Sequence, residues 1–116
     1  ETFNDYETTF RVVTEAIDRY PRLRGIYMAN LSVSGCAAAI EQAGKKGAIR
    51  LICHDLNESV RQLLLRGSID FTIPQNLQQQ GYGPLILLRD ILRRKAVPDA
   101  ARFNRQIDIV CSDNLP

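Results

Sequence analysis

The sequence has few of the residues from which catalytic and metal sites are usually built. Among its 116 residues are one histidine and three cysteines. Cys36, Cys53 and Cys111 lack the C-x-x-C spacing of zinc and redox sites, and no G-x-G-x-x-G segment marks a dinucleotide site. Because there is no nucleophile–base pair and no ligand cluster, we predict no catalytic residue, no metal and no cofactor.

Charge and hydropathy exclude two further classes of function. The net charge is +2 and the basic residues are scattered, which argues against a nucleic-acid surface. No apolar run approaches the roughly 20 residues that span a bilayer, so we predict no membrane partner. An odd number of unpaired cysteines is typical of free thiols in a reducing compartment, which favours the cytoplasm over the periplasm.

The apolar pattern predicts helices alternating with short strands. One stripe at helical spacing runs from Phe10 to Tyr20, where Pro21 follows. Apolar runs at 25–29, 49–53 and 69–73 predict three buried strands, each followed by a helical pattern. Residues 107–111 alternate between apolar and polar, as an edge strand does. The order α-β-α-β-α-β-α-β predicts an α/β fold with a mainly parallel sheet and flanking helices.

Capping residues predict where these helices begin and end. Gly44 and Gly67 are suited to end the second and third helices. Pro84 falls within the fourth helical pattern, where an interior proline costs about 3 kcal/mol, so this helix either kinks or begins late. The candidate N-terminal caps are Asn4 or Asp5, Ser32 or Ser34, Asn57, and Asn76.

A hydrogen-bonding side chain follows each of the three buried runs. These side chains are Asn30, Asp55 and Gln75. In an open α/β sheet, ligands bind at the carboxyl ends of the strands. An amide both donates and accepts, and a carboxylate accepts two hydroxyl groups at once. We therefore predict that the three residues share one cleft and bind a hydroxylated small molecule. The alternative to ligand binding is a turn residue for Asn30, a helix cap for Asp55 and a hinge residue for Gln75.

His54 and Ser32 are predicted to line the same site as secondary residues. His54 stands between Cys53 and Asp55, but neighbours on a strand point to opposite faces. The three side chains therefore cannot converge on a metal, and Cys53 has no base to activate it. The alternative for His54 is a packed core position. The alternative for Ser32 is a phosphate site at the N-terminus of the helix, formed by 32–35.

Four segments resemble the type I periplasmic-binding-protein fold. Y-M-A-N at 27–30 resembles the family's F-A-x-N-D, L-I-C-H-D at 51–55 resembles V-V-G-F-D, and 67–75 resembles G-x-i-x-a-T-I-x-Q. Q-G-Y at 80–82 resembles the start of the family's Q-x-G-x-x-A helix. Residues 107–116 resemble the last strand of lactose-repressor-type (LacI) regulators, which often end in R-E-N-L-P. The resemblance implies a two-lobed receptor that closes on a sugar, with Asn30, Asp55 and Gln75 as its hydrogen-bonding triad.

The resemblance implies that residues 1–116 are a single domain, the C-terminal part of an effector-binding domain. The first lobe and the DNA-binding domain are absent from it. We predict the sugar-binding region of a cytoplasmic LacI-type transcriptional regulator, not an enzyme, in which effector changes the lobe orientation and thereby DNA binding. DNA is a partner only through the absent N-terminal domain. Without the first lobe, Leu85, Leu88 and Leu92 would face water, so we expect a homodimer. The alternative is a periplasmic sugar-binding protein of an ABC transporter.

Overall fold

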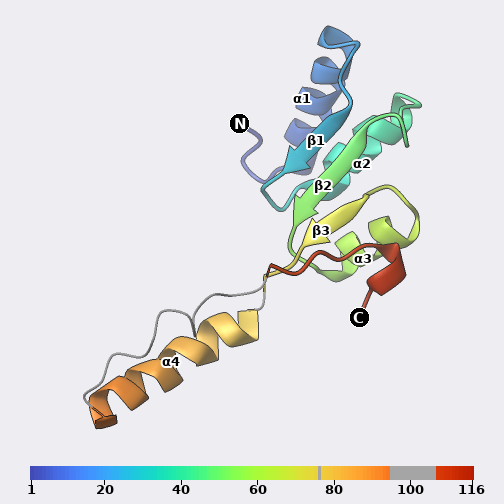
Figure 1. Cartoon of the computed structure of the whole chain (residues 1–116). Coiled ribbons are helices and arrows are strands. Elements are labelled where there is room, and N and C mark those ends of the chain that lie inside the picture. The colour runs from blue at the N-terminus through green and yellow to red at the C-terminus, as the bar shows by residue number, and fades with distance from the viewer. Residues whose placement is uncertain (76, 95–106) are drawn as a thin grey trace. The chain divides into compact units, whose positions relative to one another are not determined.

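The structure is a computed structural model that describes residues 1–75, 77–94 and 107–116 (Figure 1). The chain divides into two compact units. The first unit comprises 1–74 and 109–116 and contains the sheet, and the second comprises 75–108 and contains a long helix.

The described residues of the first unit form a parallel sheet of three strands in the order β1-β2-β3. The strands are β1 (Gly25–Met28), β2 (Arg50–His54) and β3 (Phe71–Ile73). Tyr27 is the register partner of Ile52, which in turn is the partner of Phe71. Helices connect consecutive strands, as parallel pairing requires. This arrangement confirms the predicted α/β fold with a mainly parallel sheet.

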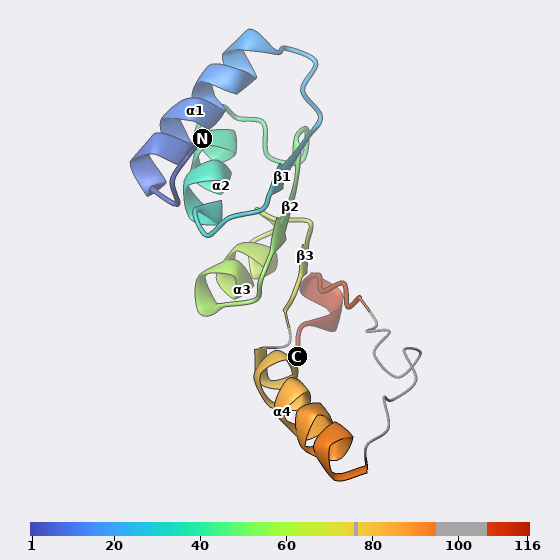
Figure 2. The same ribbon diagram turned by 90° about the vertical axis from the view of Figure 1, so that its left-hand side faces the viewer.

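Three helices lie on one face of this sheet (Figure 2). Asp5 begins the first helix, because its carboxylate accepts from the backbone N–H of Thr8 at 2.7 Å. Asn57 begins the third in the same way, accepting from Val60 N–H at 2.9 Å. Both caps were among those predicted from the sequence. The helices are α1 (Tyr6–Arg19), α2 (Val33–Gln42) and α3 (Glu58–Leu65).

The core lies between these helices and the sheet. Gly44 and Gly67 follow α2 and α3 with φ values of 64° and 67°, the left-handed conformation predicted for them. Helix α2 is small-sided, and a Cβ on Gly35 would lie 2.7 Å from the carbonyl oxygen of Tyr6, so α1 and α2 pack in close contact. The buried apolar residues are Val13, Ile17, Met28, Val33, Cys36, Ala37, Ala39, Ile40, Ile49, Leu51, Cys53, Val60, Leu63, Leu64, Ile69 and Val110.

The opposite face of the sheet is not covered by α1, α2 or α3 (Figure 2). Along β2, Leu51 and Cys53 are buried while Ile52 and His54 are half-buried. Tyr27 of β1 is 54% exposed. The alternation along each strand therefore sends one set of side chains into the core and leaves Tyr27, Ile52 and His54 on the open face.

The predicted edge strand at 107–111 is wrong as a regular strand. Among the described residues of this segment, Val110 alone pairs with β3, in an isolated antiparallel bridge to Thr72. A 3-10 helix, Ser112–Asn114, follows at once. The side chain of Asn114 accepts from the backbone N–H of Cys111 at 2.7 Å, and this local bond turns the chain away from the sheet.

The second unit contains α4 (Leu77–Arg94), which includes Pro84. A helix beginning at Pro84 is therefore excluded, although proline has no N–H to donate within it. Leu85, Leu88 and Leu92 are more than half exposed. No helix in the described parts of the chain is long and apolar enough to cross a bilayer. The predicted cap Asn76 lies outside the described residues, as do residues 95–106.

Candidate functional site

Asn30 follows β1 and lies at the carboxyl edge of the sheet. Its Nδ2 donates to Oγ1 of Thr2 at 2.5 Å, and its Oδ1 accepts from the backbone N–H of Ser32 at 3.2 Å. These two contacts hold the amide in place and leave one N–H and one lone pair for another group. Asn30, Tyr27 and the N-terminal segment 1–4 line a hollow of about 480 Å³ at this edge.

Asp55 follows β2 at the same edge of the sheet. Met28 pairs with Cys53 in the register, and Asn30 and Asp55 each come two residues later in the chain, just beyond the ends of β1 and β2. Asn57, rather than Asp55, caps α3, so the helix-cap alternative for Asp55 is wrong. Within the described residues, nothing donates to the Asp55 carboxylate. Its lone pairs are therefore available to hydroxyl groups.

The backbone of Asp55 is held in an uncommon conformation. Its φ is 67°, in the left-handed region that side-chain-bearing residues seldom adopt. Its N–H donates to the carbonyl of Ile73 at 3.0 Å, and its own carbonyl accepts from Oγ1 of Thr72 at 2.5 Å. Such conformations persist where the surroundings over-determine them, and they gather at ligand sites. Sequence reasoning missed Thr72, because its contact depends on how β3 pairs with β2.

Gln75, the third predicted residue, is exposed and follows β3 and Pro74. It begins the second unit, whereas Asn30 and Asp55 belong to the first. The structure thus places Asn30 and Asp55 at one sheet edge. The common cleft that includes Gln75 stays a prediction.

His54 lies at the end of β2 on the open face of the sheet. The Tyr27 hydroxyl is hydrogen-bonded to Nε2 of His54, and the two rings meet edge to face with centroids 5.4 Å apart. Nδ1 of His54 is buried without a protein partner. Cys53 is buried in the core, whereas His54 is half-buried on the open face. This confirms the prediction that their side chains point to opposite faces of the sheet. Among the described residues, no group of three metal-binding side chains is present. Sequence reasoning missed Tyr27, since pairing the two rings requires the strand register.

Ser32 is buried, and only 5% of the surface of this residue is exposed to solvent. It precedes α2, yet its hydroxyl makes no cap bond and has no protein partner. Its backbone N–H supports Asn30, and Ser32 is not among the residues lining the hollow beside Asn30. Its direct contact with a ligand stays a prediction.

Two of the three cysteines are buried in the core. Burial raises the pKa of the Cys36 thiol to about 12, and burial also raises the pKa of Cys53. Both are free thiols, as predicted, and both are fully covered. A protonated, covered thiol is a poor nucleophile. These residues therefore serve packing rather than chemistry.

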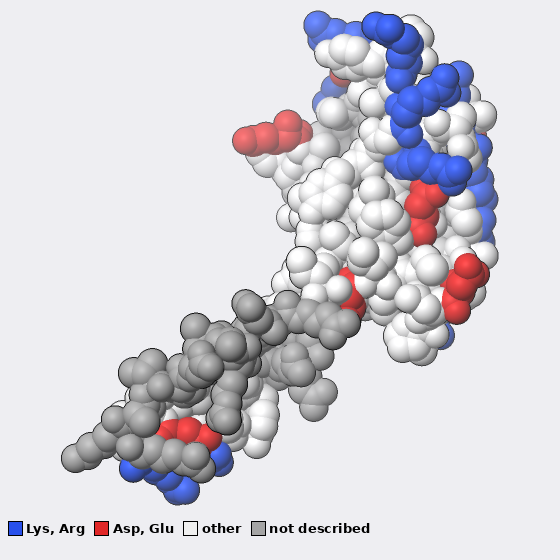
Figure 3. Space-filling model, in the orientation of Figure 1, with Lys and Arg blue, Asp and Glu red and all other residues white. Residues whose placement is uncertain are grey.

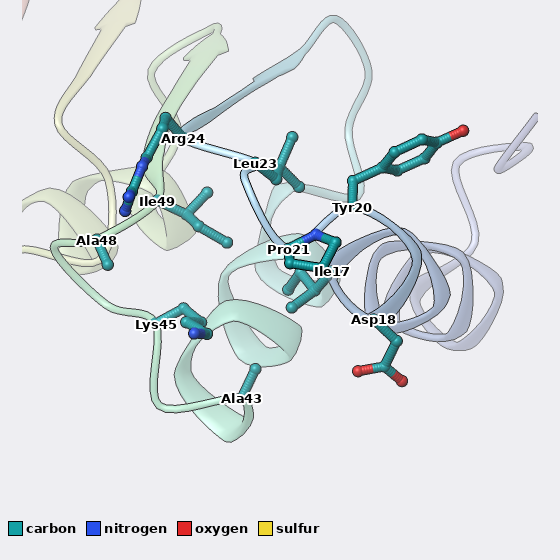
Figure 4. Close-up of a pocket in the computed structure, with 10 residues that line it drawn as sticks. All are labelled: Ile17, Asp18, Tyr20, Pro21, Leu23, Arg24, Ala43, Lys45, Ala48 and Ile49. Carbon is teal, nitrogen blue, oxygen red and sulfur yellow. The ribbon is translucent and has the colours of Figure 1, made fainter.

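A second hollow, of about 360 Å³, lies at the amino-terminal edge of the sheet (Figure 4). Arg24 precedes β1 and Lys45 precedes β2, and both line this hollow together with apolar side chains that include Ile17 and Ile49. Lysine and arginine gather over the amino-terminal ends of the strands (Figure 3). The hollow contains none of the predicted ligand residues. The carboxyl edge, where ligands bind in open α/β sheets, is therefore the candidate site.

Comparison with known proteins identifies the family that has this fold. Residues 1–96 match the family described as the periplasmic binding protein domain. The chain belongs to this family. It is 31% identical over 80 residues to the D-allose-binding periplasmic protein of Escherichia coli (strain K12), an alignment that covers 68% of this chain and 26% of that protein.

Solved structures of sugar-binding proteins share the fold. GanP, a glucose-galactose binding protein from Geobacillus stearothermophilus, superposes with a TM-score of 0.83 at 20% identity, covering 100% of this chain and 41% of its own. The sugar-binding protein of a sugar ABC transporter from Bacillus halodurans gives 0.81 at 24% identity, covering 97% and 42%. The chain spans less than half the length of each protein.

Proposed function

We propose that this chain forms part of a sugar-binding protein and that the carboxyl edge of its sheet is one wall of the sugar site. The observation that carries the proposal is the Asp55 carboxylate, to which no described residue donates a hydrogen bond and which follows β2 just as Asn30 follows the neighbouring strand β1. A carboxylate and an amide together accept from and donate to the hydroxyl groups of a sugar. The role is binding, without catalysis.

The proposed assignment is a binding protein of an ABC transporter rather than a transcriptional regulator. It is supported by the relatives, which are named as sugar-binding proteins. The free thiols argue less strongly for the cytoplasm than the sequence suggested, because Cys36 and Cys53 are buried and so protected from oxidation.

The LacI-type regulator is the second candidate. The N-L-P segment at 114–116 favours it, because this segment resembles one that such regulators often carry after their last strand. The residues encoded directly upstream in the gene separate the two candidates. A secretory signal would support the transport protein, and a helix-turn-helix would support the cytoplasmic regulator.

The location of the sugar site can be tested by NMR on the 116-residue chain. D-allose would be titrated to millimolar concentration while the backbone amide shifts are followed. We expect shifts at Asn30 and Asp55, and a weak affinity, because a sugar site normally encloses its ligand on more than one side. Shifts confined to the hollow lined by Arg24 and Lys45, or no shifts at all, would contradict the proposed site.

A further inference from the structure

Asp55 needs support to keep the conformation in which it is found. Its φ of 67° belongs to the left-handed region, which is sterically unfavourable for a residue with a Cβ, although Asp adopts it more often than most such residues. The direction of the Cα–Cβ bond depends on φ. If residue 55 returned to an extended conformation, its carboxylate would point elsewhere.

Two hydrogen bonds from β3 support this conformation. The N–H of Asp55 donates to the carbonyl of Ile73 at 3.0 Å, and the Thr72 hydroxyl donates to the carbonyl of Asp55 at 2.5 Å. Together they fix both peptide groups of Asp55. The first bond uses backbone atoms and is open to any residue at position 73. The second needs a hydroxyl group at position 72.

Thr72 is itself held firmly. It is fully buried, and its backbone exchanges two hydrogen bonds with Val110, at 2.8 and 2.9 Å. Its hydroxyl also lies 3.2 Å from the carbonyl of Cys53. The contact with Asp55 is the shorter of the two, and a hydroxyl has one hydrogen to donate. Water does not compete at a covered site, so the bond to Asp55 is strengthened.

We infer that Thr72 is a positioning residue, whose hydroxyl holds Asp55 in the left-handed conformation and thereby aims its carboxylate at the ligand. Thr72 does not touch the ligand, because it is buried below the surface. The inference rests on the proposed function for the role of Asp55 in sugar binding. The conformational part of it stands on the hydrogen bonds alone.

The conformational part can be tested without any sugar. Thr72→Val keeps the shape of the side chain and removes the hydroxyl, whereas Thr72→Ser keeps the hydroxyl and serves as the matched control. The φ angle of residue 55 would be measured by NMR, from the HN–Hα coupling and the Cα and Cβ shifts. We expect a positive φ in the wild type and in T72S, and its loss in T72V.

A positive φ retained in T72V would overturn the inference. If T72V does not fold, Thr72→Cys provides the comparison, since a thiol of similar size is a weak donor. This variant is then expected to show a mixture of conformations at residue 55. A φ in T72C identical to that of T72S would equally contradict the inference.

The binding part is tested by a double-mutant cycle with D-allose. T72V should weaken binding about tenfold, as the loss of one hydrogen bond does. It should have no further effect in a chain that already carries Asp55→Ala, because the hydroxyl acts through that carboxylate. An equal weakening in both backgrounds would overturn the positioning role. If the wild type bound no D-allose, the proposed function would fail, and the φ measurement would still decide the conformational inference.

Discussion

The hydroxyl group of Tyr27 is hydrogen-bonded to Nε2 of His54, across the two strands whose ends hold Asn30 and Asp55. The two rings also meet edge to face. His54 thus has a protein partner for one ring nitrogen, whereas no described residue donates to the Asp55 carboxylate. We therefore expect Asp55 to contribute more to ligand binding than His54, whose ring offers mainly a packing surface.

The contact between α1 and α2 predicts opposite effects for two helical glycines. Gly35→Ala should lower the free energy of unfolding by about 1–3 kcal/mol, because the new Cβ would meet the carbonyl oxygen of Tyr6 at 2.7 Å. Gly81→Ala in α4 is the control, since a Cβ there meets nothing within 4 Å. Alanine should raise helix stability at that position by about 0.5–1 kcal/mol. Urea unfolding followed by circular dichroism measures both. Equal effects at the two positions would contradict the close packing of α1 and α2.

Because the Cys36 thiol is buried, we expect the protein to lose stability in alkaline solution. Burial raises the pKa of this thiol from the ordinary 9.0 to about 12. As the pH rises above 9.0, the thiol ionises in the unfolded chain and stays protonated in the folded one, so deprotonation favours unfolding. Below that pH the thiol is protonated in both states and adds no pH dependence. Stability should therefore fall between the two values.

Urea unfolding across this pH range, compared with Cys36→Ala, measures the effect. The variant lacks the thiol and should lose stability less steeply with pH, although it is less stable at neutral pH because alanine is smaller. Identical slopes in the two proteins would show that Cys36 ionises equally easily in both states.

The exposed leucines of helix α4 lead us to expect that the chain self-associates. Leu85, Leu88 and Leu92 are exposed by 66, 54 and 70%. Covering such side chains is worth about 1.5–3 kcal/mol each, so the wild type should sediment as a dimer at micromolar concentration. Replacing the three leucines with glutamine should give a monomer. Leu65→Gln on α3, a leucine exposed by 57%, is the control and should leave the dimer intact. A monomeric wild type with an ordered α4 would refute the homodimer.

Much of the fold follows from local features of the sequence. Asp5 and Asn57 begin helices because their side chains accept backbone N–H groups within the next turn. Gly44 and Gly67 end helices because glycine adopts a positive φ without strain. These signals lie within a few residues of one another. They can therefore be recognised in the sequence without knowledge of the tertiary structure.

The features that escaped prediction depend on contacts between distant residues. The segment 107–111 alternates like a strand, but its pairing is limited to Val110 and Thr72, because a 3-10 helix follows at Ser112–Asn114. The Tyr27–His54 pair and the Thr72–Asp55 bond both depend on the strand register. The sequence could place Asn30 and Asp55 at one edge of the sheet. It could not show that the backbone of Asp55 adopts the left-handed conformation.

The affinity of the chain for D-allose, compared between Asp55→Ala and His54→Ala, tests the central claim most directly. The titration would be followed by NMR at millimolar sugar, with the exposed Asp113→Ala as the control for loss of a carboxylate elsewhere. Hydrogen bonds to a charged group are worth about 1.5–3 kcal/mol, so Asp55→Ala should weaken binding by at least about tenfold. His54→Ala should weaken it less, and Asp113→Ala should leave it unchanged. Equal losses in D55A and H54A, or full binding by D55A, would contradict a sugar site built on Asp55.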